Sequence, residues 1–197
     1  MSLNIAITGS IATDHLMRFP GKFTDSLVAD KLDHVSLSFL VDDLQIRRGG
    51  VGANVAFAMG KMGLRPILVG AVGKDFAEYR SWLERHNVDC ESIHYSEEKH
   101  TARFVCTTDE VANQIASFYP GAMSESNQIE LGPVIDRLGK IDFVFIGPSD
   151  PEAMIKHTEE VKQRKIAKKI TNKVNHPGRP CYEIWQYDDL KRNSRIS

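Results

Sequence analysis

Short, continuously apolar runs recur along the first 160 residues and predict buried strands. Residues 4–9 read NIAITG, residues 66–72 read PILVGAV, and residues 141–147 read IDFVFIG. Runs of this length, bounded by Gly or Pro, are typical of parallel strands that are covered on both faces. Residues 35–44, by contrast, alternate apolar and polar side chains over their first half, which predicts a half-exposed strand.

Helical spacing follows three of these runs. Over residues 52–62, apolar side chains at i, i+3, i+4 and i+7 predict an amphipathic helix that ends at Gly63. Its apolar face is expected to consist of Val55, Ala58, Met59 and Met62. A second helix is expected from an N-cap at Asp75 to about His86, with Phe76, Tyr79, Trp82 and Leu83 on its apolar face. Asp150 followed by Pro151 predicts a third helix that runs to about residue 162.

Three short strands are predicted between the second and third helices. Residues 91–96, 101–108 and 114–119 carry alternating patterns and are separated by polar turns. Consecutive strands with tight turns favour an antiparallel element over crossover connections. The pattern therefore predicts an α/β protein with a doubly wound parallel sheet and a small β insert.

Charge divides the chain near residue 161. The 197 residues have a net charge of -1, but residues 161–197 carry +7 and residues 1–160 carry -8. The basic segment shows no sustained period of 2 or 3.6, which favours a tail outside the fold, either disordered or produced by a frameshift. A nucleic-acid-binding arm is the alternative, because Tyr182, Trp185 and Tyr187 lie among the basic residues. No recognisable DNA- or RNA-binding motif accompanies them.

Amino-acid composition indicates which class of protein this is and in which cellular compartment we expect it. A hydrophobic fraction of 42% is enough for a packed core and excludes a chain disordered throughout. No run of 18 apolar residues predicts a membrane span, and the N-terminus lacks the pattern of a secretory signal. The three cysteines lie far apart, without zinc or disulfide spacing. We therefore expect a cytoplasmic protein without a membrane contact.

Two polar groups are placed where ligands bind in open α/β sheets, outside the carboxyl ends of the strands. Ser10 and Asp14 follow the first strand, and residues 49–54 (GGVGAN) precede a helix. Glycines let backbone approach a ligand, while the Asn54 amide and the Asp14 carboxylate suit vicinal hydroxyls. A capping Asp, a capping Asn and a plain tight turn are the alternatives. GGVGAN lacks the third glycine of a dinucleotide fingerprint and the GK[ST] of a P-loop. The pattern alone indicates a small polar ligand.

A longer motif extends this interpretation. Residues 49–73, GGVGANVAFAMGKMGLRPILVGAVG, combine paired glycines, an asparagine, small residues and glycines at two downstream spacings. They resemble the N-terminal signature of the PfkB/ribokinase family of sugar and nucleoside kinases. ITGSIATDHLMRFPG, VSLSFLVDDLQIRRGGVGAN, HTARFVCTTD and QIASFYPGAMSE resemble in particular the actinobacterial type of adenosine kinase. The similarity covers residues 3–164.

The resemblance implies a ribokinase-like fold over residues 1–164, with a small antiparallel β lid whose strands lie within 35–44 and 91–119. It implies that Asp14 and Asn54 hold the ribose hydroxyls and that Gly50 presents its backbone to them. Ser10 and Ser38 match polar positions near the nucleoside. Phe104 and Phe118 match aromatic positions against the base, with ordinary packing inside the lid as the alternative. The lid of this type of kinase also pairs two subunits, which implies a homodimer.

The implied reaction is ATP- and Mg²⁺-dependent phosphorylation of a ribosyl hydroxyl, most simply adenosine to AMP; ribose or another sugar remains open as the acceptor. The family's catalytic D-T-x-G-A-G-D motif is absent from these 197 residues, so no catalytic residue and no metal ligand is assigned. We expect a chain truncated after about residue 164, with residues 165–197 outside the family fold, and inactive alone. The alternatives are a non-catalytic fragment that binds a nucleoside or sugar or dimerises, and an unrelated α/β binding protein.

Overall fold

Four parallel strands form the central sheet, and a computed structural model describes them within residues 3–26 and 37–170. Their order across the sheet is β10–β9–β1–β4. Their bounds are β1 (Ile5–Thr8), β4 (Ile67–Val69), β9 (Phe143–Ile146) and β10 (Ala167–Ile170). The three predicted buried strands are confirmed, except that the chain after β4 breaks at Gly70 and continues as β5 (Ala71–Val72).

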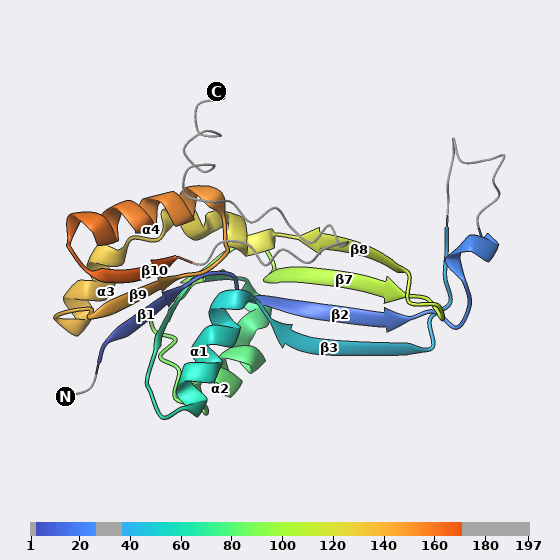
Figure 1. Ribbon diagram of the computed structural model, residues 1–197, viewed down its shortest axis with the longest axis horizontal. Helices are drawn as coiled ribbons and strands as arrows, with labels where there is room; N and C mark the ends of the chain where they lie inside the picture. Colours follow the sequence, from blue (N-terminus) through green and yellow to red (C-terminus); the bar gives the residue numbers. More distant parts are fainter. Residues whose placement is uncertain (1–2, 27–36, 171–197) are drawn as a thin grey trace, which may run out of the picture.

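Helices cover both faces of this sheet, as the doubly wound prediction requires. One face carries α1 (Val51–Lys61) and α2 (Ala77–Glu84), and the other carries α3 (Leu131–Leu138) and α4 (Pro151–Gln163) (Figure 1). Alternate side chains of β1 serve the two cores: Ile5 and Ile7 pack with α1 and α2, whereas Ala6 packs with α3 and α4. Because strand side chains alternate between faces, burial on both sides explains the continuous apolar runs.

The most deeply buried residues of the helix that follows the glycine turn differ from the apolar face that was predicted. The buried residues of α1 are Gly52, Ala53, Ala56 and Gly60. Ala58 is exposed, and Met62, just beyond the helix, is 71% exposed. Small side chains let the helix approach the sheet closely, while Val55 and Met59 of the predicted face are partly buried and pack against the core.

The other two predicted helices begin differently. In α4, the Asp150 carboxylate accepts a hydrogen bond from the Ala153 amide at 3.0 Å, so the predicted cap is confirmed. The predicted cap at Asp75 is wrong: the short helix η3 (Lys74–Phe76) precedes α2, and the Asp75 carboxylate bonds to Thr101 and Arg103. Helix α3 and the neighbouring η4 (Gly121–Gln128) were not predicted from the sequence.

A second sheet projects from the α/β body as a long arm (Figure 1). We call it the β arm; it consists of β2 (Ala12–Arg18), β3 (Asp43–Gly49), β7 (Ala102–Thr108) and β8 (Gln114–Tyr119). The order is β3–β2–β7–β8, with β2 and β7 parallel and the two outer pairs antiparallel. The β arm is therefore a mixed sheet, whereas the sequence predicted an antiparallel one.

Two of the predicted insert strands are confirmed, and two strand predictions are wrong. Strands β7 and β8 form the expected antiparallel pair. Residues 91–96 contain only β6 (His94–Tyr95), which pairs in parallel with β5 outside the β arm. The strand predicted over residues 35–44 begins at Asp43 instead; residues 37–41 have no regular structure, and residues 35 and 36 lie outside the described residues. Strand β2 was not predicted, because its sequence ATDHLMR is largely polar.

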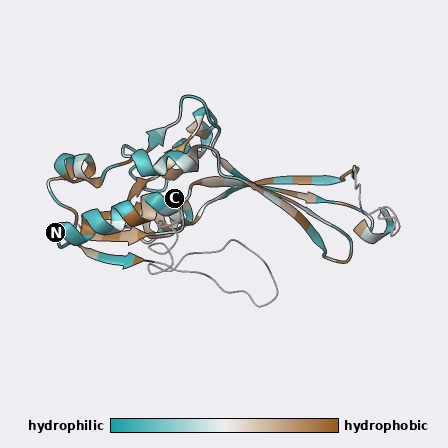
Figure 2. Ribbon diagram, turned by 90° about the horizontal axis from the view of Figure 1, so that it is seen from above, coloured by the Kyte–Doolittle hydropathy of each residue, from teal (hydrophilic) through white to brown (hydrophobic). Residues whose placement is uncertain are grey.

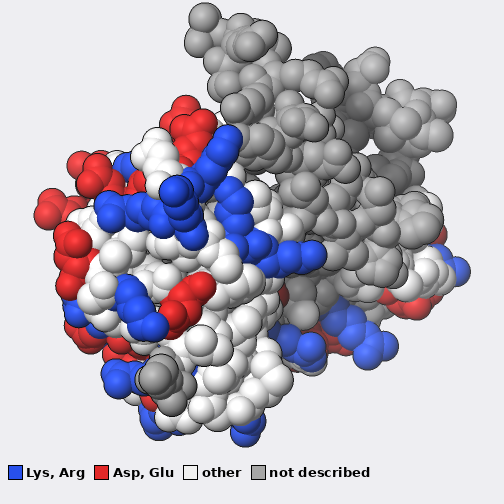
Figure 3. Space-filling view, turned by 60° about the vertical axis from the view of Figure 1, so that its left-hand side comes forward, with Lys and Arg blue, Asp and Glu red and all other residues white. Residues whose placement is uncertain are grey.

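The parallel sheet continues past the predicted fold boundary near residue 164. Strand β10, at 167–170, pairs with β9 in register from Ala167 opposite Phe143 to Ile170 opposite Ile146. At the end of the body that lies away from β3 and β8, Lys and Arg side chains are found beside Asp and Glu side chains (Figure 3). The aromatic residues of the suggested nucleic-acid arm all lie beyond residue 170, outside the described residues. Within the described residues, no helix has the length and apolar character that a membrane span requires.

Candidate ligand-binding site

One row of side chains crosses all four strands of the β arm. Arg47 lies opposite Asp14, Asp14 opposite Phe104, and Phe104 opposite Phe118. Residues opposite each other on neighbouring strands project from the same face of a sheet. The row therefore presents a carboxylate flanked by a guanidinium on one side and by two half-buried aromatic rings on the other.

The Asp14 carboxylate is half-buried, and among the described residues no side-chain or backbone donor is hydrogen-bonded to it. Burial raises the pKa of Asp14, while the positive charges of His15 and Arg47 partly oppose this effect. A desolvated carboxylate without hydrogen-bond donors favours a ligand that brings hydroxyl groups, since each hydroxyl supplies a donor to the charged oxygens.

The turn between β3 and α1 packs its backbone directly against this carboxylate. A Cβ atom on Gly49 would lie 2.6 Å from Asp14 Oδ2. Gly50 has a φ of 90°, and a Cβ there would lie 2.5 Å from the Ser10 carbonyl oxygen. Gly50 therefore excludes a side chain, and a side chain at Gly49 would displace the Asp14 carboxylate, which explains the paired glycines of the sequence motif.

Ser10 also lies at this turn, where it caps α1. Its Oγ accepts a hydrogen bond from the Val51 amide at 2.9 Å, and its carbonyl accepts one from the Ala53 amide at 3.3 Å. The N-cap residue of α1 is Gly50, which has no side chain, so Ser10 supplies the missing capping group from a different segment. Ser10 is thus near the predicted site, with its hydroxyl oxygen already engaged.

Asn54 lies on the first turn of α1. Its backbone N–H donates to the Gly50 carbonyl at 2.9 Å, which connects Asn54 to the glycine turn. The Asn54 side chain is exposed, and no described residue is hydrogen-bonded to it. Its amide therefore remains able to offer both a donor and an acceptor to a ligand.

Ser38 is not brought to this group. Strand β3 pairs with β2 from Asp43 opposite Arg18 to Gly49 opposite Ala12, so the glycine turn and Asp14 lie toward its carboxyl end. Ser38 precedes the other end of β3 and is exposed. There its neighbour Phe39 packs against Phe19, with ring centroids 4.9 Å apart. The structure thus separates Ser38 from the predicted site.

The base of β7 is anchored by a carboxylate that the sequence placed in a different role. Asp75 Oδ1 accepts from the Thr101 amide at 2.9 Å and from the Thr101 hydroxyl at 2.7 Å, and Oδ2 accepts from Arg103 at 2.7 Å. Burial alone would raise the pKa of Asp75, but these hydrogen bonds outweigh it and lower the pKa to about 2. Asp75 therefore stays ionised and holds the strand that carries Phe104.

Two further residues support the turn and were missed as functional candidates. Tyr79, which the sequence assigned only to an apolar helix face, donates its hydroxyl hydrogen to the Gly49 carbonyl at 3.0 Å. The Arg48 guanidinium lies 5.0 Å from the Trp82 ring centroid and pairs with Glu78 at 2.8 Å. The available signal was chemical: a buried tyrosine hydroxyl needs a hydrogen-bond partner.

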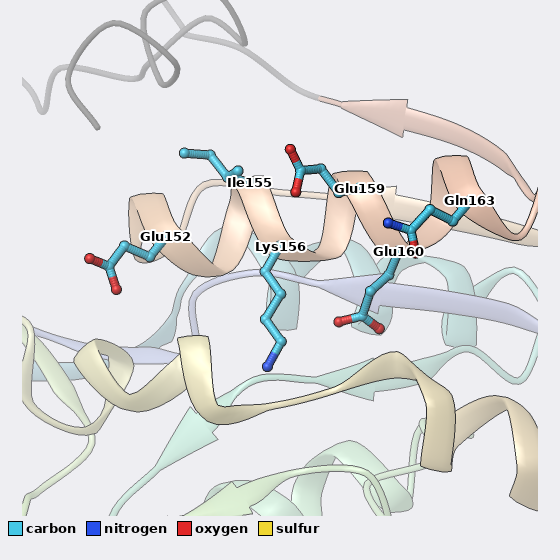
Figure 4. A pocket seen from close by; sticks show the side chains of 6 residues that line it. All are labelled: Glu152, Ile155, Lys156, Glu159, Glu160 and Gln163. Atoms are coloured by element: carbon cyan, nitrogen blue, oxygen red, sulfur yellow. The ribbon is translucent and has the colours of Figure 1, made fainter. Parts of the chain in front are cut away.

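A cavity of about 400 Å³ lies along α4, apart from this group (Figure 4). Its lining residues are Glu152, Ile155, Lys156, Glu159, Glu160 and Gln163. Lys156 and Glu160 point toward η4 and the start of α3. Lys156 donates to the Asn127 carbonyl in η4 at 3.0 Å, and Glu160 accepts from the Leu131 amide of α3 at 2.7 Å. These charged groups hold neighbouring segments together, and the cavity shares no residue with the Asp14 row.

The described residues provide no metal site. Among residues 3–26 and 37–170, no three His, Cys, Asp or Glu side chains gather closely enough to hold a metal ion.

Comparisons with known proteins bear on the same segments. A nucleoside kinase of Methanothermobacter thermautotrophicus is 38% identical over 95 residues, which cover 47% of this chain and 31% of the relative. The structure of Burkholderia thailandensis nucleoside kinase in complex with inosine is 30% identical, with a TM-score of 0.68. It matches 84% of this chain and 51% of its own.

A third similarity concerns the fold alone. The nucleoside kinase of Methanocaldococcus jannaschii, described as an archaeal member of the ribokinase family, has a TM-score of 0.64 at 24% identity over 80% of this chain and 48% of its own. The chain thus spans about half the length of these solved structures and less of the curated relative. The family model described as pfkB family carbohydrate kinase matches residues 11–177, and because that match spans most of the sequence, the chain belongs to this family.

Proposed function

We propose that this chain forms the nucleoside-binding part of an ATP-dependent nucleoside kinase. The observation that carries the proposal is the row across the β arm, in which a carboxylate stands beside two aromatic rings. A nucleoside has the matching chemistry, with vicinal hydroxyls at one end and a flat aromatic base at the other. In this proposal Asp14 and Asn54 bind the ribose hydroxyls, Gly50 presents its backbone to them, and Phe104 and Phe118 pack against the base.

The finer assignment is adenosine as the acceptor, with AMP as the product. The inosine complex of the Burkholderia enzyme supports a purine nucleoside. ATP and Mg²⁺ are the proposed cosubstrates, as the family implies. The D-T-x-G-A-G-D motif is absent from the 197 residues, so we propose that they bind a nucleoside without phosphorylating it. A cytoplasmic location is part of this proposal, because cysteines without disulfide or zinc spacing suit a reduced compartment.

The opposite face of the β arm supports a second element of the proposal, a homodimer. Four large apolar side chains are exposed on that face, with relative exposures between 45% and 62%: Leu44, Ile46, Ile115 and Tyr119. Leu44 and Ile46 lie on β3, and Ile115 and Tyr119 lie on β8, the two outer strands of the β arm. Several large apolar side chains exposed on one face favour a surface that binds a partner. We propose that two copies pair through this face, which lies opposite the face that carries the Asp14 row.

Calorimetric titration of the 197-residue chain tests the nucleoside proposal. Adenosine and inosine are expected to bind, ribose to bind more weakly, and 2′-deoxyadenosine to bind about tenfold more weakly than adenosine because it lacks one hydroxyl. Asp14→Asn is expected to weaken adenosine binding by about tenfold or more, because it removes a charged acceptor. Asp136→Asn, an exposed aspartate on α3, is the matched control. Equal affinity of wild type and Asp14→Asn would reject the assignment of Asp14.

Two further measurements separate the finer claims. An assay of ATP-dependent AMP formation is expected to show no turnover, and measurable turnover would overturn the non-catalytic reading. Sedimentation velocity is expected to show a dimer that Ile46→Lys dissociates, since a charge would be buried at the paired faces. A wild-type monomer at all concentrations would reject the homodimer while leaving the nucleoside proposal intact.

A further inference from the structure

The peptide unit between Gly49 and Gly50 lies in the glycine turn beside Asp14. A trans peptide is planar, and the Gly49 carbonyl and the Gly50 N–H point in opposite directions within that plane. Two glycines flank this peptide unit, and neither carries a Cβ atom that would restrict rotation of the peptide plane. The direction of the Gly50 N–H therefore depends on what holds the Gly49 carbonyl.

Tyr79 holds that carbonyl. Its hydroxyl hydrogen is donated to Gly49 O at 3.0 Å, and the side chain, which α2 delivers, is only 5% exposed. The ring packs against Phe76 at 5.4 Å and Trp82 at 5.9 Å between centroids, so it cannot easily turn away. Burial raises the pKa of Tyr79, an effect that the nearby Arg48 partly opposes, so the phenol remains protonated and able to donate.

The two glycines of this peptide unit also contact residues of the candidate site. The Cα of Gly49 packs against the Asp14 carboxylate, and that of Gly50 packs against the Ser10 carbonyl. The Gly49 carbonyl thus connects α2, on the body, with the end of β3, which pairs with β2, the strand that carries Asp14. A hydrogen bond at this point fixes the backbone donor and the carboxylate relative to each other.

We propose that Tyr79 is a positioning residue: by holding the Gly49 carbonyl, it aims the Gly50 N–H toward the ligand and keeps the turn seated against Asp14. Tyr79 touches no ligand in this proposal and acts only through the Gly49–Gly50 peptide. The benefit for ligand binding rests on the proposed function, whereas the ordering of the peptide does not.

Tyr79→Phe tests this by removing one oxygen while keeping the ring. Tyr95→Phe is the matched control, because Tyr95 is 40% exposed and its hydroxyl accepts from Arg80, away from the turn. We expect the NMR order parameter of the Gly50 N–H to fall in Tyr79→Phe and to stay unchanged in Tyr95→Phe. We also expect the pKa of Asp14, followed by carboxyl carbon shifts, to move toward its ordinary value as the packing of Gly49 loosens.

The functional readout is the affinity for adenosine and inosine. Loss of one buried hydrogen bond that orients a donor is expected to raise both dissociation constants about five- to tenfold, with less than twofold change in the control. Unchanged Gly50 order and unchanged Asp14 pKa in a folded Tyr79→Phe protein would overturn the proposal. Failure of the wild type to bind either nucleoside would instead overturn the proposed function, since the ligand-free readouts decide the positioning role separately.

A wild-type measurement keeps the proposal falsifiable if Tyr79→Phe does not fold. The Gly50 N–H is expected to be as ordered as the neighbouring amides of α1 without any ligand, with one orientation in residual dipolar couplings. Averaging between two orientations in the ligand-free chain would contradict a turn that Tyr79 already fixes.

Discussion

The α/β body and the β arm are built by different rules. In the body, Ile7, Val144 and Ile146 are fully buried between two layers of helices. In the β arm, every residue of β3 except Gly49 is exposed, and β8 is nearly as open. Figure 2 shows the same contrast as hydrophobic strands in the body and alternating hydropathy along the arm.

This difference separates stability from recognition. Burial of apolar side chains in the body supplies most of the free energy of folding. The β arm buries little by itself, which suits the proposed binding of a ligand on one face and of a second copy on the other. Mutations in the body are therefore expected to change the free energy of unfolding, and those in the arm to change binding.

The largest expected effect comes from truncating the body core. Ile7→Ala, on the central strand β1, is expected to lower the free energy of unfolding by about 3–4 kcal/mol, from lost burial plus a cavity. Val111→Ala, in the turn between β7 and β8 of the β arm at 53% exposure, is the control and is expected to change it by less than about 0.5 kcal/mol. Urea denaturation measures both, and similar losses in the two variants would contradict the division between body and arm.

A buried histidine gives the body a pH dependence of its own. His157 on α4 is 3% exposed and donates from Nε2 to the Ile129 carbonyl at 3.2 Å. Burial lowers its pKa to about 4, below the ordinary value of 6.5. The unfolded chain therefore binds a proton that the folded chain excludes, and stability falls as the pH drops from 6.5 toward 4.

At pH 5 the loss attributable to His157 is expected to be about 2 kcal/mol relative to pH 7.5. His157→Gln is expected to remove this dependence, whereas His100→Gln, at a side chain that is 66% exposed, is expected to retain it. Denaturant titrations at the two pH values make the comparison. The same pH dependence of the free energy of unfolding in wild type and His157→Gln would show that His157 is not its source.

The junction between body and arm gives a smaller effect at lower pH. Asp75 has its pKa lowered to about 2 from 3.8, so its contribution is complete above pH 4 and is lost as the pH falls toward 2. Asp75→Asn is expected to cost about 1–2 kcal/mol at pH 7, because Thr101 and Arg103 lose a charged acceptor. Asp136→Asn is the control. A cost equal to that of the control would show that Asp75 does not anchor β7.

The body could be predicted from the sequence because its buried strands appear as short, continuous apolar runs. The runs at residues 4–9, 66–72 and 141–147 became strands where they were expected, and Asp150 capped α4. The β arm could not be predicted in the same way. Strand β2 carries Asp14 and His15 on a half-exposed surface, so hydropathy gives no signal, and its parallel pairing with β7 is set by distant segments.

The site was partly predictable for a related reason. The glycine pair and Asn54 belong to the motif at residues 49–73, whereas Asp14 was singled out because it follows the first strand. The structure packs the glycine turn against the Asp14 carboxylate. Ser38 was matched by resemblance, but the structure places it at the far end of β3. Tyr79 was missed because its role is a tertiary hydrogen bond from α2 to Gly49, which no local pattern encodes.

The location of the nucleoside is the central claim, and an NMR titration of the labelled chain with adenosine tests it most directly. We predict saturable shifts concentrated at the amides of Asp14, Gly50 and Asn54 and at the ring signals of Phe104 and Phe118. The residues of α3 and α4 are expected to remain unchanged. Shifts confined to the α4 cavity, or none at millimolar adenosine, would contradict the account.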